Sequence, residues 1–240
     1  METLPIYISI TFILVTFITV IFFFIASRSR VSLVILILWL LLQGLIARTG
    51  FYTTIDTYPQ RFMLLIGPPL AMILGLFVTP QGRHFLDRLD PAMLTLLHVI
   101  RIPVEVVLYW LFLYKTIPEL MTFEGRNFDI LSGITAPLVY YFGFIRKVLS
   151  KKIMILWNVI CLGLLLNIVI NAILSAPLPF QKFAFDQPNQ AVLHFPFNWL
   201  PACVVPLVLF SHLATIRKLL QRHSSVDENP VMPISKSNLA

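Results

Sequence analysis

The sequence has little charge and little cysteine. Charged residues make up 12% of the 240 residues, against about 25% in typical soluble domains. The two cysteines, Cys161 and Cys203, both lie inside apolar runs, so neither a disulfide framework nor a zinc-type Cys spacing is present. The chain also lacks a Walker A motif, an HExxH motif, a GxSxG motif and a glycine-rich dinucleotide loop. A nucleotide-dependent function within this chain is therefore not predicted.

Apolar residues dominate instead. They form 58% of the chain, and the mean hydropathy is +0.86. Seven segments have roughly the 17–25 residues that a helix needs to cross about 30 Å of hydrocarbon. The sequence predicts an all-α, polytopic transmembrane helix bundle of one domain, residues 1–220. Its spans are expected at about 4–26, 31–47, 62–79, 92–114, 130–146, 153–175 and 196–217.

Basic residues are distributed unevenly between the two ends of these spans. With the N-terminus outside and the C-terminus inside, twelve Lys and Arg residues lie on the cytoplasmic side and five on the outer side. This bias follows the positive-inside rule, and the opposite orientation would invert it. The net charge of +7 is thus explained by the loops, and nucleic-acid binding is not predicted. Residues 221–240 are polar and are expected to form a disordered cytoplasmic tail.

The three outer connections, residues 48–61, 115–129 and 176–195, are rich in aromatic residues and proline. Aromatic side chains favour the membrane–water interface. We expect these loops to lie down as interfacial caps or short helices. The segment 80–91, on the cytoplasmic side, is expected to be a loop.

The fourth span carries a polar stripe. At 100° per residue its four polar side chains fall within about 80° of one another. Arg101 and Glu105 lie near mid-membrane, and side chains four residues apart on a helix are neighbours, so the two charges are expected to neutralise each other. The stripe must face the bundle interior. Its residues are His98, Arg101, Glu105 and Tyr109.

The sixth span repeats small and polar residues every four positions, among them Asn167 and Asn171. This spacing favours close helix packing and hydrogen bonds between helices. We place both amides near the polar stripe. The leading functional hypothesis is binding or transport of a small molecule or ion through the polar bundle interior.

A second hypothesis is a membrane-embedded enzyme. Several polar side chains are predicted at the outer face, and a carboxylate pair with a histidine could perform acid–base chemistry. The simpler interpretation is that these groups bind one another and hold the loops down, so enzymatic activity is not the leading prediction. The cluster comprises Glu124, Arg126, Asn127, Asp129, Asp186 and His194.

No cofactor or metal is predicted as such, but two histidines leave one alternative open. His98 and His212 are expected at similar depth, where a facing pair could ligate a b-type haem. A structural or assembly subunit without a ligand is a further alternative. The expected partners are the lipid bilayer and an unidentified small molecule or ion, with a homo-oligomer or another membrane subunit as further possibilities.

Two stretches of the C-terminal half carry a resemblance: FEGRNFDILSGITAPLVYYF (123–142) and AILSAPLPFQKFAFDQPNQAVLHFPFNWLP (172–201). They are similar to those of uncharacterised bacterial polytopic membrane proteins. The resemblance implies a setting in the bacterial inner membrane and implies no activity.

Overall fold

A computed structural model describes residues 4–54 and 60–227, and this part of the chain contains helices and no strand. The aromatic and acidic residues predicted to cap the membrane at 55–59 lie outside it. The α-helices are α1 (Ile6–Ser27), α2 (Arg30–Arg48), α3 (Met63–Val78), α4 (Pro80–Arg88), α5 (Pro91–Leu97), α6 (Arg101–Leu113), α7 (Ile130–Val139), α8 (Lys151–Leu174) and α9 (Val205–Asp227). Short 3-10 helices are η1 (Phe51–Thr53), η2 (His98–Ile100), η3 (Glu119–Met121) and η5 (Ala191–Leu193), and two π-helical turns are η4 (Tyr140–Ile145) and η6 (Leu200–Val204).

Several of these helices are long and apolar enough to cross a membrane. Among the described residues there are five: α1, α2, the continuous segment Pro91–Leu113, α8 and Leu200–Gln221. A sixth results if α3 and α4, which meet at 91°, are counted as one bent span. The apolar helix Ile130–Ile145 is shorter. The predicted all-helical, membrane-compatible fold is confirmed, while the number of seven spans remains a prediction.

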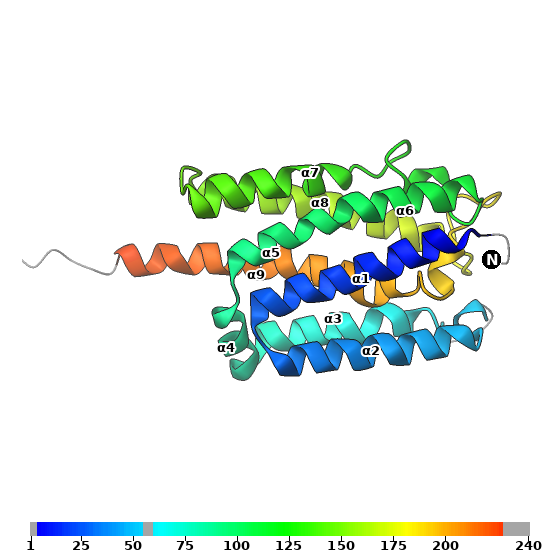
Figure 1. The fold of residues 1–240 in the computed structure, drawn as a ribbon, viewed down its shortest axis with the longest axis horizontal. Coiled ribbons are helices and arrows are strands. Elements are labelled where there is room, and N and C mark those ends of the chain that lie inside the picture. Colours follow the sequence, from blue (N-terminus) through cyan, green and yellow to red (C-terminus); the bar gives the residue numbers. More distant parts are fainter. Residues whose placement is uncertain (1–3, 55–59, 228–240) are drawn as a thin grey trace, which may run out of the picture.

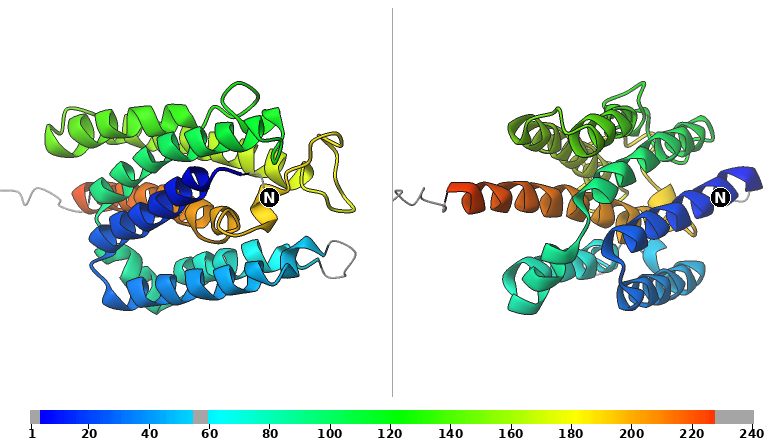
Figure 2. Two further views of the ribbon diagram at one scale, coloured as in Figure 1. Left: turned by 45° about the vertical axis from the view of Figure 1, so that its right-hand side comes forward. Right: turned by 60° about the vertical axis from the view of Figure 1, so that its left-hand side comes forward.

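The bundle has three layers (Figure 1). Helices α2 and α3 lie on one side, α7 and α8 on the other, and α1, α5, α6 and α9 run between them; the further views keep this arrangement (Figure 2). In the middle layer α1 contacts α5 and α6, and α9 contacts α5 and α8. Residue Ile6 at the start of α1 and Asp227 at the end of α9 lie at opposite ends of the bundle.

Large apolar side chains cover the outside of the bundle. On α2, Val31, Leu38 and Leu45 recur every seventh residue and are 69%, 61% and 66% exposed. A soluble protein rarely exposes contiguous apolar surface of this kind, whereas lipid solvates it. The segment Leu200–Gln221, which comprises η6 and most of α9, is the most buried of the five long apolar segments, at 67%, against 28% for α2 and for α8.

Four helices that start at the end of the bundle where α9 finishes begin with a capping side chain. Ser29, Thr79, Asp90 and Ser150 each accept a hydrogen bond from a backbone N–H in the first turn of α2, α4, α5 and α8. Such caps satisfy N–H groups that have no partner inside a helix. They allow the chain to reverse direction within very few residues.

The segment expected as a loop at 80–91 instead contains α4. The Thr79 hydroxyl accepts from Gly82 N at 3.1 Å and Pro80 occupies the first helical turn, a combination that favours a helix start. The chain turns through 91° here because α4 packs directly on the end of α3. A Cβ at Gly82 would lie only 2.4 Å from the Leu76 carbonyl oxygen, so this contact requires glycine.

Prolines account for the irregular helical turns in two central helices. Pro206 has no N–H, so the carbonyl of Ala202, four residues earlier, loses its helical donor. Trp39 Nε1 from α2 donates to that carbonyl at 2.8 Å, and the chain there forms the π-helical turn η6. Similarly, Pro103 follows the 3-10 turn η2, which divides α5 from α6. The backbone polar groups of a membrane-embedded bend must find such partners within the protein.

The outer connections each contain a short 3-10 helix, in keeping with the expected short helical caps. The last of them folds back over the end of α6: the backbone N–H groups of Gln190 and Ala191 both donate to Thr116 O at 3.1 Å. At the opposite end, α9 continues through Asp227, so the predicted disordered tail does not begin at 221. Residues 228–240 of that tail lie outside the described part of the chain.

The α3–α4 corner provides a test of the fold. Gly82→Ala is expected to lower the free energy of unfolding by about 1–3 kcal/mol, because the added methyl group overlaps backbone atoms of Leu76. Gly75→Ala is the matched control, since a Cβ there meets nothing within 4 Å. Thermal unfolding in detergent should show a lower midpoint for the first variant alone. Equal midpoints for the two variants would contradict the described corner.

Candidate functional site

Polar side chains from three helical segments and from the polypeptide before α7 meet inside the bundle. The segment Pro91–Leu113 contributes Arg101 and Glu105, α9 contributes His212 and α8 contributes Asn158. Each of these four side chains belongs to a residue at most 2% exposed. The polypeptide leading into α7 adds Asn127 and Asp129, which are 0% and 5% exposed. We call these six residues the polar cluster.

Arg101 is the centre of the cluster. Its Nη1 lies 3.0 Å from Asp129 Oδ1, forming an ion pair between two buried side chains. Its Nη2 lies 3.2 Å from His212 Nε2, and His212 Nδ1 lies 2.9 Å from Asn158 Oδ1. Because a guanidinium can only donate, His212 Nε2 is the acceptor and Nδ1 carries the proton that is donated to Asn158. This pattern describes a neutral imidazole.

Glu105 is bound by an amide. Asn127 Nδ2 donates to Glu105 Oε1 at 2.5 Å and to the Met121 carbonyl at 3.1 Å. Asn127 Oδ1 in turn accepts from the Asp129 backbone N–H at 3.1 Å. One side chain thus fixes Glu105 and orients the residue that pairs with Arg101. Within the described residues, Glu105 Oε2 has no hydrogen-bond partner.

The predicted ion pair between Arg101 and Glu105 is replaced by a different pairing. In the described part of the chain, Arg101 forms its ion pair with Asp129, and no hydrogen bond or ion pair joins Arg101 to Glu105. The physical reason is the close approach of α7. A Cβ at Gly133 would lie 2.8 Å from Ile102 Cγ1, so only glycine lets α7 come this near, and Asp129 is one turn before Gly133.

Two histidines and a tryptophan lie beside the cluster. The rings of His98 and His212 stack with centroids 3.8 Å apart and planes 13° apart, and Trp157 lies 5.7 and 5.8 Å from them. Axial haem ligands must point their nitrogens at one iron between them. Two imidazoles stacked face to face at this distance leave no room for an iron, so the pair does not fit the haem hypothesis, and we derive no function from it.

His98 is nevertheless unusual. It is fully buried, yet among the described residues neither of its ring nitrogens has a hydrogen-bond partner. Buried polar atoms without a partner are rare in native proteins. His98 therefore lies at the edge of the cluster as a buried side chain whose ring nitrogens have no hydrogen-bond partner among the described residues.

Three residues predicted in or near the polar stripe lie apart from the cluster. Tyr109 is half-buried and stacks on Phe123 with centroids 5.0 Å apart. Asn167 is exposed and donates to the Arg126 carbonyl at 2.9 Å, and Asn171 donates to Asn167 at 3.3 Å. These two amides fasten α8 to the outer loop before α7.

The outer-face group divides into two sets. Asn127 and Asp129 turn inward and join the cluster, whereas Glu124, Arg126 and Asp186 are exposed. His194 Nδ1 lies 3.1 Å from the Gln190 carbonyl. Across the described segments, no hydrogen bond or ion pair connects the side chains of Glu124, Asp186 and His194 with one another. The convergence that the outer-face enzyme hypothesis requires is not observed.

Sequence reasoning missed two contributors. Asn158 falls on the opposite side of α8 from Asn167, and that opposite side is the one that faces inward. His212 was considered only as a haem ligand. The available signal was depth. Asn158 and His212 each lie in the half of their predicted spans, 153–175 and 196–217, that is nearer the predicted cytoplasmic side, so they can meet without being neighbours in sequence.

The comparisons with known proteins give a family and no activity. Residues 59–220 match a family described as Domain of unknown function (DUF8737). The chain belongs to this family. Neither a curated protein nor a solved structure matches it. All six residues of the polar cluster fall inside the DUF8737 region, while α1 and α2 precede it.

Asp129→Asn is expected to destabilise the protein by about 3–5 kcal/mol, because it leaves Arg101 buried without its charged partner. Asp186→Asn removes the same charge from an exposed position and serves as the control. Thermal unfolding in detergent measures both. An Asp129→Asn midpoint equal to that of the control would show that the ion pair does not stabilise the fold.

Gly133→Ala is expected to separate α7 from α6 and to cost about 1–3 kcal/mol, since the methyl group overlaps Ile102. Gly163→Ala in α8 meets nothing within 4 Å and should leave stability unchanged. In the Asp129→Asn background, Gly133→Ala should lower the free energy of unfolding by less, because the Arg101–Asp129 ion pair that it disturbs is already lost. Full additivity in this double-mutant cycle would refute the link between Gly133 and the ion pair.

Proposed function

We propose that this DUF8737 protein is a multi-pass membrane protein whose polar cluster takes up a proton and relays it through the bundle. The observation that carries the proposal is a count of charge. Two carboxyl groups, Glu105 and Asp129, share one guanidinium, Arg101, and all three are almost completely buried. With both acids ionised, the cluster would hold one uncompensated negative charge.

An uncompensated charge inside a membrane protein costs several kcal/mol, and binding a proton removes that cost. The two carboxyl groups are not equivalent. Asp129 contacts the Arg101 guanidinium directly, whereas Glu105 contacts only the neutral amide of Asn127. The proton therefore resides on Glu105, whose Oε2 is free to carry it.

A relay also needs groups that can pass the proton onward. The groups on the segment Pro91–Leu113 that can carry the proton are Glu105 and His98, about 10 Å apart at 1.5 Å per residue. Arg101 lies between them and keeps its own proton, so it acts as a fixed positive charge. His212 is bonded to Arg101 and stacks on His98, and its imidazole can exchange a proton at either nitrogen. This succession connects the outer loop at Asn127 with the opposite half of the bundle.

The same proposal includes seven crossings with the N-terminus outside, in a bacterial inner membrane. The alternating direction of the helices in Figure 1 supports it, as does the excess of basic residues at the end where α9 finishes. The segment Ile130–Ile145 would be a short crossing of about 24 Å at 1.5 Å per residue, and the bent α3–α4 pair another.

The experiment is proton flux into liposomes. Purified protein is reconstituted with a trapped pH-sensitive dye, and a potassium gradient with valinomycin supplies the driving potential. Wild-type protein should change the internal pH faster than protein-free liposomes. Glu105→Gln should fall to the protein-free rate, because the amide resembles the protonated carboxyl in shape but cannot release a proton. Its neutral side chain also leaves the Arg101–Asp129 pair intact.

Glu124→Gln is the control, since Glu124 is exposed and lies outside the cluster. It should retain the wild-type rate. A wild-type rate equal to that of protein-free liposomes at both polarities of the potential would reject proton relay. The cluster would then be a structural ion pair that fixes the packing of α7 against α6.

A further inference from the structure

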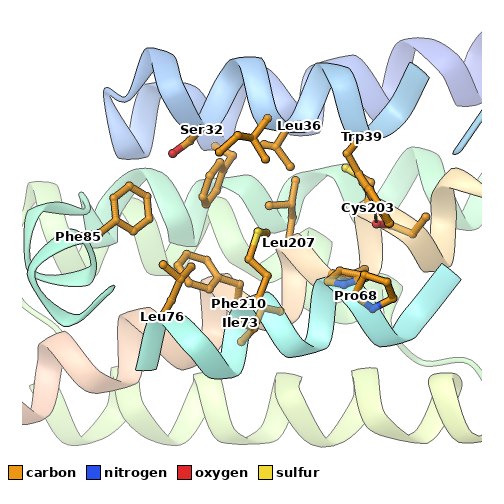
Figure 3. Close-up of a pocket in the computed structure, with 16 residues that line it drawn as sticks. Ser32, Leu36, Trp39, Pro68, Ile73, Leu76, Phe85, Cys203, Leu207 and Phe210 are labelled. Carbon is orange, nitrogen blue, oxygen red and sulfur yellow. Dashed lines mark hydrogen bonds between the residues drawn. The ribbon is translucent and has the colours of Figure 1, made fainter. Parts of the chain in front are cut away.

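A crevice runs between α2 and α3, on the opposite side of α9 from the polar cluster. Figure 3 shows α2 and α3 as its walls and α9 as its floor. The crevice contains about 250 Å³ of free space and is lined almost entirely by apolar side chains. Leu36 and Trp39 line it from α2, Ile73 from α3, and Leu207 from α9.

The crevice stays open because α2 and α3 are each fixed in place by contacts with other segments. Two indoles bind α2 to η6 and to the residue before it: Trp39 Nε1 donates to Ala202 O, and Trp199 Nε1 donates to Leu40 O. Helix α3 is held by its corner with α4 and by contacts with α9.

One end of the crevice is basic. Ser32 and Phe85 mark this end, where the α1–α2 turn and α4 lie (Figure 3). Arg83 Nε donates to the Phe77 carbonyl at 3.0 Å, which holds its guanidinium at the end of α3. Three further exposed arginines come from the same two segments: Arg28, Arg30 and Arg88. The acidic residue of α4, Asp87, is paired with Arg217 and does not cancel them.

We infer that this crevice holds one acyl chain of an anionic phospholipid, whose phosphate lies against the arginines of the α1–α2 turn and α4. The apolar part accepts the chain because its walls belong to helices whose outer faces are lipid-compatible. The arginines select a negatively charged headgroup, since guanidinium groups bind phosphate through several donors at once. This inference concerns a different face of the protein from the proton relay and does not depend on it.

Native mass spectrometry of protein released from nanodiscs tests the site. Wild-type protein should retain one phosphatidylglycerol more strongly than one phosphatidylcholine. The double variant Arg30→Ala/Arg83→Ala should lose this preference, because both arginines are exposed and their removal spares the core. Arg146→Ala/Lys147→Ala is the control, since it removes two exposed positive charges from the α7–α8 turn instead.

A second variant separates chain insertion from simple attraction of the headgroup. Ile73→Phe fills the crevice while leaving all arginines in place, and it should also reduce the retained phosphatidylglycerol. Phosphatidylglycerol brominated in its acyl chain should quench the fluorescence of Trp39, because Trp39 lines the crevice. This part of the quenching should be absent in Trp39→Phe.

Three results would overturn the inference. The first is equal retention of the two lipids by wild-type protein. The second is the same loss of preference in the control variant, which would indicate nonspecific charge. The third is undiminished retention in Ile73→Phe together with no quenching of Trp39, which would place the lipid outside the crevice.

Discussion

Arg101 must be neutralised where it lies, because it is almost completely buried and its segment is surrounded by apolar helices. This requirement organises the centre of the molecule. It calls for a carboxylate from outside the Pro91–Leu113 segment, and Asp129 supplies it only because Gly133 lets α7 approach within contact of Ile102. It also fixes His212 as an acceptor, which in turn sets the direction of the bond to Asn158. The ion pair and hydrogen bonds that begin at one guanidinium thus help to position three helices.

Glu105 occupies a different position from the one suggested by its spacing from Arg101. It is bound through Asn127, so the cluster contains an acid that is not the direct partner of the base. A purely structural ion pair would need only one carboxylate. The additional acid, a neutral histidine and the uncommitted His98 give the centre more protonation states than packing alone requires.

The sequence was informative where a physical rule acts locally. Apolar runs located the helices within a few residues, except that α9 continues ten residues past the predicted end at 217. The polar stripe placed His98, Arg101 and Glu105 on a side that is buried in the structure. It was less informative where the decisive neighbour is distant in the chain. Asp129 and Asn127 were assigned to the outer face because they precede a span, and nothing local indicates that they turn inward. Likewise, the Thr79 cap and Pro80 could have indicated α4, but segment 80–91 was interpreted from its charge instead.

The π-helical turn η6 and α9 join two parts of the molecule that share no side-chain contact described above. Trp39 donates to the Ala202 carbonyl, which lacks a helical donor because of Pro206, and Trp39 also forms part of the crevice wall. His212 lies less than two turns beyond Pro206 in α9. A helix is stiff over so short a distance. A tilt of α9 that widened or narrowed the space beside α2 would therefore also displace the imidazole of His212, which is bonded to Arg101.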